Sequence, residues 1–343
     1  MRVGRFLIPH FFDNDDSGSC FLATSPKCVV EEICPNNSVV WSADERLLEA
    51  KTIVDRAAAL HHAHQEPFKL SRIAASHAMS CLLARKGHAT LQETPFAFSG
   101  TREEALRDYG THLSLSHETF IGGALAWSAN PTGTHSTGSP GMTVFALDIV
   151  DVLDVERVSC RFPERMRRLL TPRVPLYDSF LENDHSNNED LARELCIPAE
   201  LLSSTLDSEN TLMKASYPSF SVLHPLYTVS QCILAQRWSL RECCVKLLGI
   251  PHRAFNYACV ECDGGMPEGR QGCGGFQRSL PSGLWHPNTL YVTRVVGEER
   301  AVFKSRGLVP HLQVISMFKC LKTLEGELRP VVVTMASCKR LSC

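Results

Sequence analysis

The first 38 residues of the chain lack a sustained hydrophobic period and contain several Asp, Asn and Ser residues, so they predict a poorly ordered leader. Regular patterning begins at Trp41. Ser42 has the position of a helix cap because Glu45 follows three residues later, and apolar residues then recur at helical spacing as far as residue 60. A second apolar stripe predicts a helix over residues 71–85.

Strand patterns follow this helical part of the chain. Residues 96–100 predict a short strand, the polar–apolar alternation over 112–117 predicts another, and 122–127 predicts its hairpin partner. A polar loop with Pro and Gly, residues 128–141, then divides the chain into two parts.

The second part begins with an apolar strand over 142–150. A strong helix is predicted over 228–248, and later strands are predicted over 255–262, 290–295 and 312–318. Residues 178–222 look like an insertion, and 264–282 form a Gly-rich loop. The mixture predicts an α+β fold with an N-terminal half over 39–140 and a C-terminal half over 141–343.

Composition narrows the class of protein. The net charge is -2, so the chain lacks the basic excess of a broad nucleic-acid surface. No apolar run is long enough to span a bilayer, and the N-terminus does not resemble a signal peptide. The 15 cysteines are odd in number and scattered, which favours reduced thiols in the cytoplasm, with the mitochondrion as the alternative compartment.

Three local patterns can carry chemistry. Asp148 interrupts an apolar strand, where a carboxylate needs a compensating partner such as Mg²⁺. Glu242 and Lys246 lie one helical turn apart and suit a cation and a phosphate, although an ordinary surface ion pair has the same spacing. Ser116 and His117 follow a strand and can hydrogen-bond a phosphate. Each pattern alone has a plain structural explanation.

Together, the order of these patterns resembles the 4′-phosphopantetheinyl transferase superfamily, in its larger surfactin-synthetase-activating type. The similar blocks are residues 113–127 (LSLSHETFIGGALAW), 146–149 (ALDI) and 238–246 (WSLRECCVK). The sequence departs from the family pattern at Ala146, Val150 and Arg241, and the expected Gly-Lys-Pro element is replaced by residues 99–102, where Arg102 can substitute.

The resemblance implies a monomer with two similar halves in a pseudo-two-fold arrangement. It implies an Mg²⁺-dependent holo-[acyl-carrier-protein] synthase that moves phosphopantetheine from coenzyme A to a serine of an acyl carrier protein or carrier domain. Asp148 and Glu242 would bind Mg²⁺, and Glu242 and Lys246 would be catalytic. The coenzyme A phosphates would be held by a further set of residues: Arg72, Ser116, His117 and Lys246.

Two alternatives remain open. One is a catalytically impaired relative that binds coenzyme A or a carrier without transfer. The other is a thiol-rich zinc-binding interaction protein, suggested by Cys259, Cys262 and Cys273. His61, His62 and His64 are interpreted as a solvated face. The sequence does not distinguish fatty-acid biosynthesis from polyketide, nonribosomal-peptide or lysine-pathway carriers.

Overall fold

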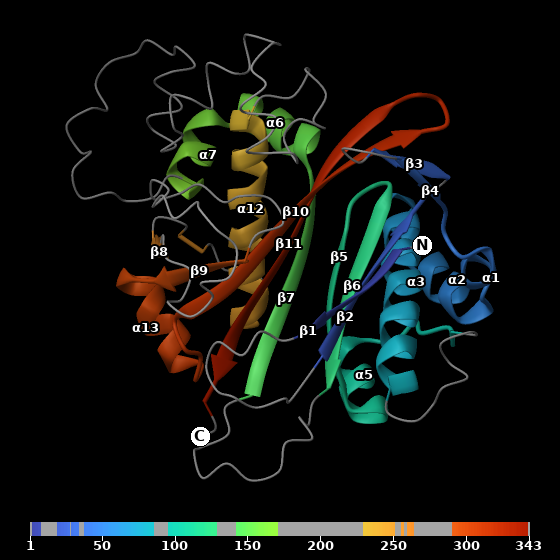
Figure 1. Cartoon of the computed structure of the whole chain (residues 1–343), viewed down its shortest axis with the longest axis horizontal. Helices are drawn as coiled ribbons and strands as arrows, with labels where there is room; N and C mark the ends of the chain where they lie inside the picture. Colours follow the sequence, from blue (N-terminus) through green and yellow to red (C-terminus); the bar gives the residue numbers. More distant parts are fainter. Residues whose placement is uncertain are drawn as a thin grey trace, which may run out of the picture.

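The chain folds into two antiparallel sheets with helices on their outer faces, which makes it an α+β protein, as predicted (Figure 1). The computed structural model describes residues 2–7, 19–27, 29–33, 38–85, 95–128, 142–170, 229–250, 255–256, 259–263 and 290–341. Within these ranges, no helix combines the length and the apolar character needed to cross a membrane.

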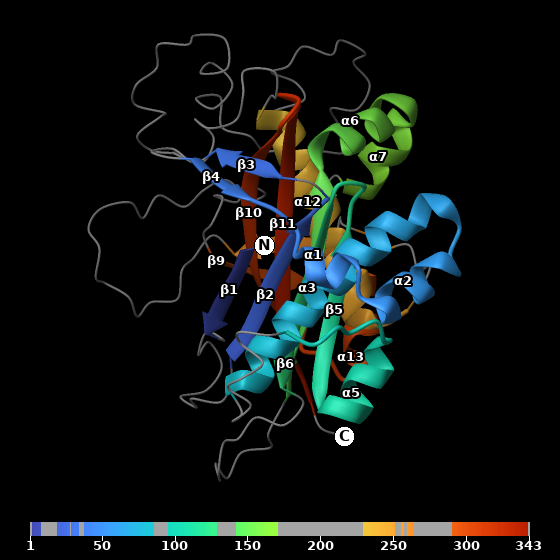
Figure 2. The ribbon, with the colours of Figure 1, turned by 90° about the vertical axis from the view of Figure 1, so that its right-hand side faces the viewer.

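The smaller sheet has four strands in the order β1-β2-β6-β5. Their bounds are Arg2–Leu7 (β1), Ser19–Pro26 (β2), Thr111–His117 (β5) and Ile121–Ser128 (β6). The long helix α3 packs against β2, β5 and β6, and Figure 2 shows it along the outer face of this sheet. The helices on this side are Glu45–Leu48 (α1), Lys51–Ala58 (α2), His62–Arg85 (α3) and Arg102–Tyr109 (α5).

The larger sheet contains seven strands, with β7 at one edge in the order β4-β3-β10-β11-β7 and with β9 and β8 continuing from β10. Their bounds are Val30–Ile33 (β3), Ser38–Trp41 (β4), Met142–Asp151 (β7), Val260–Asp263 (β8), Leu290–Val295 (β9), His311–Thr323 (β10) and Leu328–Arg340 (β11). Its helices are Val152–Arg161 (α6), Pro163–Leu170 (α7), Val229–Leu248 (α12) and Gly297–Ser305 (α13).

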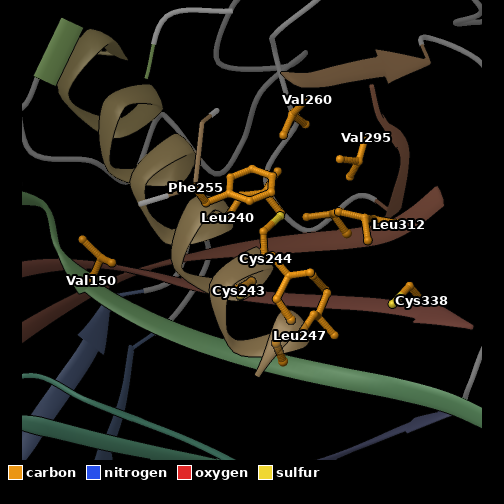
Figure 3. Packing of buried hydrophobic residues seen from close by; sticks show 14 of the residues in the cluster. Val150, Leu240, Cys243, Cys244, Leu247, Phe255, Val260, Val295, Leu312 and Cys338 are labelled. Carbon is orange, nitrogen blue, oxygen red and sulfur yellow. The ribbon is translucent and has the colours of Figure 1, made fainter. Parts of the chain in front are cut away.

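Strand β7 shows how the layers are assembled. Its even-numbered apolar residues, such as Val144 and Ala146, pack with α12 in the core shown in Figure 3. Its odd-numbered residues, such as Leu147 and Ile149, pack against Leu125 and its neighbours in the four-stranded sheet. Because side chains of a strand alternate between faces, β7 is covered by α12 on one side and by the other sheet on the opposite side.

The structure corrects the predicted N-terminal region. The prediction of a poorly ordered leader over residues 1–38 is wrong for the strands that lie within it, and β2 has a buried apolar run, Phe21 to Ala23. Strands β3 and β4 join the seven-stranded sheet, which otherwise consists of the second part of the chain. The division into halves at residues 39–140 and 141–343 stays a prediction.

Two local predictions also change. The first helix is capped by Asp44, whose side chain accepts the backbone N–H of Arg46, and not by Ser42. Residues 96–100 form no strand; their backbone is held instead by α3, because the N–H of Phe98 donates to Ser76 Oγ at 2.9 Å. The insertion over 178–222 and the Gly-rich loop over 264–282 lie outside the described residues.

Candidate functional site

The two sheets meet where their edge strands β5 and β7 run side by side. Edge strands present N–H and C=O groups without a neighbouring strand. Here Ser114 Oγ accepts the N–H of Leu147 at 2.9 Å, and Ser116 Oγ accepts the N–H of Ile149 at 3.0 Å. The residue numbers rise together, so the strands are parallel, and side chains replace the missing backbone partner. We call this junction the β5–β7 seam.

The seam brings three of the predicted residues into direct contact. Ser116 Oγ donates to Asp148 Oδ1 at 3.0 Å, and Lys246 Nζ reaches the same oxygen from α12 at 2.7 Å. Lys246 Nζ also donates to the carbonyl oxygen of Leu147 at 2.7 Å. The Asp148 side chain is only 8% exposed, so it needs these partners to offset the cost of burying its charge.

Glu242 lies one turn before Lys246 on α12 and is half-buried. Burial raises the pKa of its carboxyl, the Arg241 guanidinium opposes that rise, and the Asp148 carboxylate adds to it. Arg241 Nη1 donates to Glu242 Oε1 at 2.5 Å, and Arg241 Nε donates to the carbonyl oxygen of Phe255 at 3.1 Å. Its guanidinium also lies over the Trp238 ring. Arg241 therefore holds Glu242 in place and compensates its charge.

His117 and Arg72 border the seam on the side of α3. The His117 side chain is exposed, yet partial desolvation lowers its pKa, and the charges of Lys246, His64 and Arg72 lower it further. A neutral imidazole at pH 7 donates one hydrogen bond but adds no charge. Burial likewise lowers the pKa of Arg72 to about 10, with contributions from the neighbouring guanidinium groups of Arg56 and Arg102. Arg72 remains protonated.

The Arg72 guanidinium has unsatisfied donors. Its Nε and Nη1 are buried and find no acceptor among the residues that the structure describes. One face of the group lies over the Phe68 ring, 4.7 Å from the ring centroid. A buried N–H without an acceptor is costly, so this group suits an incoming anion.

Glu118 belongs to the same seam and was missed by the sequence reasoning. It follows β5, and its carboxyl accepts a hydrogen bond from the backbone N–H of Asp151, which continues the series begun by Ser114 and Ser116. Burial, with the nearby charges of Asp154, Asp148 and Asp151, raises the pKa of Glu118 to about 8. The alternation of positions 114, 116 and 118 was the available signal, since side chains two apart on a strand share a face.

Asp148 and Glu242 carry the type of ligand that a hard divalent cation prefers. Mg²⁺ is commonly bound by one or two carboxylates together with water and substrate phosphates. The Asp148 carboxylate lies close enough to Glu242 to raise the pKa of Glu242. Across the described part of the chain, no group of three or more His, Cys, Asp or Glu is arranged to hold a metal. Of the three suggested zinc ligands, Cys259 is buried with a free thiol, and Cys273 lies outside the described residues.

The three exposed histidines at the start of α3 remain a surface feature. The rings of His61 and His64 are 6.1 Å apart between centroids.

Comparison of the chain with models of protein families, with curated proteins and with solved structures gives no match.

Proposed function

We propose that this chain is a 4′-phosphopantetheinyl transferase. The reaction takes coenzyme A and the serine of an apo carrier protein, depends on Mg²⁺, and releases adenosine 3′,5′-bisphosphate. The observation that carries the proposal is the contact of Ser116, Asp148 and Lys246 at the β5–β7 seam. These residues come from three separate sequence blocks, and each block on its own has a plain structural explanation.

The fold supports the proposal at a coarse level. Two antiparallel sheets pack face to face, and each has helices on its outer side. We propose that the sheets belong to two similar halves related by a pseudo-two-fold axis, in a monomer. The seam then lies between the halves, where one ligand can contact residues of both.

The charges around the seam suit the phosphates of coenzyme A. Arg72, with its two unsatisfied buried N–H groups, and Ser116 and His117 at the end of β5 are assigned to the 3′-phosphate. Lys246 is assigned to the pyrophosphate of coenzyme A. Its ammonium group would then donate to a phosphate oxygen, either in place of the Asp148 oxygen that it contacts now or in addition to it. Neutral His117 contributes by hydrogen bonding.

Asp148 and Glu242 are assigned to Mg²⁺. When bound, the cation would neutralise charge on the pyrophosphate and polarise its phosphorus–oxygen bonds. Glu242 would have to turn part of its carboxylate from Arg241 toward the cation. The position of Arg241 between Phe255 and Trp238 leaves it able to hold the second carboxylate oxygen.

The reaction transfers the phosphopantetheinyl group of coenzyme A in a single displacement at phosphorus. The carrier serine oxygen forms a bond to the β-phosphorus of coenzyme A, the bond from that phosphorus to the bridging oxygen breaks, and the electron pair leaves with adenosine 3′,5′-bisphosphate. The serine proton must go to a base. Glu242 is the candidate, because burial raises its pKa toward the range in which a carboxylate accepts protons effectively.

The ion pairs already present at the site favour a second candidate, a relative that binds coenzyme A without transferring its phosphopantetheine arm. Glu242 is already engaged by Arg241 at 2.5 Å, and Lys246 by Asp148 at 2.7 Å, so ligands must compete with existing ion pairs. A relative that binds coenzyme A without transferring its arm would have the same arrangement. The carrier that would be modified and the cytoplasmic or mitochondrial site of action stay predictions from the sequence.

The test separates binding from turnover. Coenzyme A binding is measured by calorimetry with and without Mg²⁺, and release of adenosine 3′,5′-bisphosphate is measured with apo carrier proteins. Wild type should bind and turn over, while Glu242→Gln should bind and release no product. Asp55→Asn, which alters an exposed carboxylate of α2, is the matched control and should behave as wild type. Wild-type turnover by Glu242→Gln would refute the assignment, and wild-type binding without product from any carrier would favour the second candidate.

A further inference from the structure

A small open pocket lies at the start of the β5–β7 seam, next to the site described above. It has a volume of about 120 Å³ and is bordered by β5, β6, β7, β11, the beginning of α5 and the end of α12. The residues that give it chemical character are Arg102, His112, Trp127, Lys246 and Arg340. Lys246 connects it to Asp148, because its ammonium donates to that carboxylate.

The polar side chains that line this pocket are almost all hydrogen-bond donors. Arg102, Lys246 and Arg340 carry positive charge, and the lining residues that the structure describes include no carboxylate. Arg102 is the first residue of α5, so the helix N-terminus lies at the same border, where Glu103 and Glu104 offset part of its positive charge. Asp148 neutralises part of the charge of Lys246, but Arg102 and Arg340 add positive charge at the same border, which an anion would offset.

Trp127 lines this pocket and carries a hydrogen-bond donor without a described acceptor. The residue is only 6% exposed, and its indole Nε1 is buried without an acceptor among the described residues. The ring stacks on His112, with centroids 5.3 Å apart, and meets Phe145 edge-on. Because a buried indole N–H normally has a hydrogen-bond partner, its missing acceptor matches the excess of donors around the pocket.

We propose that this pocket binds a phosphate dianion, at a site separate from Ser116, His117 and Arg72. The anion would be clamped by Arg102 and Arg340 at the entrance and would accept hydrogen bonds from the Trp127 indole and from Lys246. His112 adds one more donor from its ring. The volume suits a single phosphate group with a few water molecules, and not a whole nucleotide.

Binding at this pocket is linked to the Asp148 site through Lys246. An anion in the pocket and the Asp148 carboxylate compete for the same ammonium group. Phosphate binding therefore weakens the Lys246–Asp148 pair, which leaves Asp148 more available to a cation. The phosphate can be free in solution or be a phosphomonoester group of a larger ligand.

The experiment measures binding to the full chain by calorimetry, with inorganic phosphate, coenzyme A and dephospho-coenzyme A as separate probes. Trp127→Phe removes the N–H and keeps the ring, and Arg340→Gln changes an exposed residue at the end of β11 without disturbing the core. Lys304→Gln, an exposed cation of α13, is the control. Each of the first two variants should weaken phosphate binding about tenfold, the loss expected for one hydrogen bond to a charged group.

The outcomes separate the sources of the phosphate. Saturable binding of inorganic phosphate to wild type and Lys304→Gln, weakened in both pocket variants, would support a site for free phosphate. Tighter binding of coenzyme A than of dephospho-coenzyme A, with the difference lost in both pocket variants, would identify the bound group as the 3′-phosphate of coenzyme A and would overturn the assignment of that phosphate to Arg72, Ser116 and His117. Equal binding by all four proteins, or no phosphate-dependent binding at all, would overturn the proposal. No turnover is measured, so the result is independent of the proposed transferase activity.

Discussion

The contact between Lys246 and Asp148 should contribute measurably to folding stability, because it is largely removed from water. The two side chains are 20% and 8% exposed, and their atoms are 2.7 Å apart. Removing one partner of a buried ion pair costs about 3–5 kcal/mol, since the other charge stays buried. Partial exposure of Lys246 and the remaining bond from Ser116 reduce that cost, so Lys246→Met should lower the free energy of unfolding by about 2–3 kcal/mol.

A double-mutant cycle isolates the pair from its surroundings. Unfolding in urea is followed by circular dichroism for wild type, Lys246→Met, Asp148→Asn and the double variant. The double variant should be about 1–2 kcal/mol more stable than the sum of the single losses predicts, because neither charge is then left alone. If the losses add to within about 0.5 kcal/mol, the pair does not act as a coupled buried unit and the reasoning fails.

Two further predictions concern the β5–β6 hairpin. A Cβ at Gly122 would lie 2.3 Å from the backbone atoms Leu70 C and Ser71 N, whereas one at Gly123 would meet the end of the Ile149 side chain at 2.4 Å. Gly122→Ala should therefore cost more than about 3 kcal/mol and Gly123→Ala about 1–2 kcal/mol, measured by urea unfolding; equal losses would contradict the packing. The pKa of Glu118 is raised from 4.5 to about 8 in the folded state, so that state binds more protons between these values and stability falls as pH rises through this window. Glu118→Gln should remove this fall and exceed wild-type stability at pH 9 by on the order of 2 kcal/mol, with no gain at pH 4; parallel pH profiles for the two proteins would disprove the role of Glu118.

Local patterns predicted the elements that form the seam. The alternation over 112–117 became β5, the apolar run over 142–150 became β7, and the helical stripe over 228–248 became α12. These elements have clear periods because each has one consistently buried face or is buried on both sides. Strand β11 was not predicted, although it is the neighbour of β7.

Pairing between distant segments could not be read from periodicity. Strand β2 lies between β1 and β6, and β3 pairs with β10, almost 290 residues further along the chain. These short N-terminal strands gain their stability from neighbours supplied by remote parts of the sequence, so their own composition resembled a disordered leader. Glu118 was missed for the same reason, because its hydrogen-bond partner, the N–H of Asp151, belongs to a different strand, β7.

The candidate site, like the fold, could be predicted from the sequence only in part. Sequence order suggested that Ser116, Asp148 and Lys246 belong together, and the structure brings them into contact. The sequence did not reveal that Lys246 is shared between Asp148 and a donor-lined pocket. That arrangement depends on how two sheet edges meet, which no single motif encodes.

The transferase proposal is tested most directly by intact-mass spectrometry of an apo acyl carrier protein incubated with this protein, coenzyme A and Mg²⁺. The carrier should gain the mass of one phosphopantetheine group with wild type and with Asp55→Asn, and should stay unmodified with Asp148→Asn. An unmodified carrier in every reaction, across fatty-acid, polyketide and peptide carriers, would contradict the proposed activity.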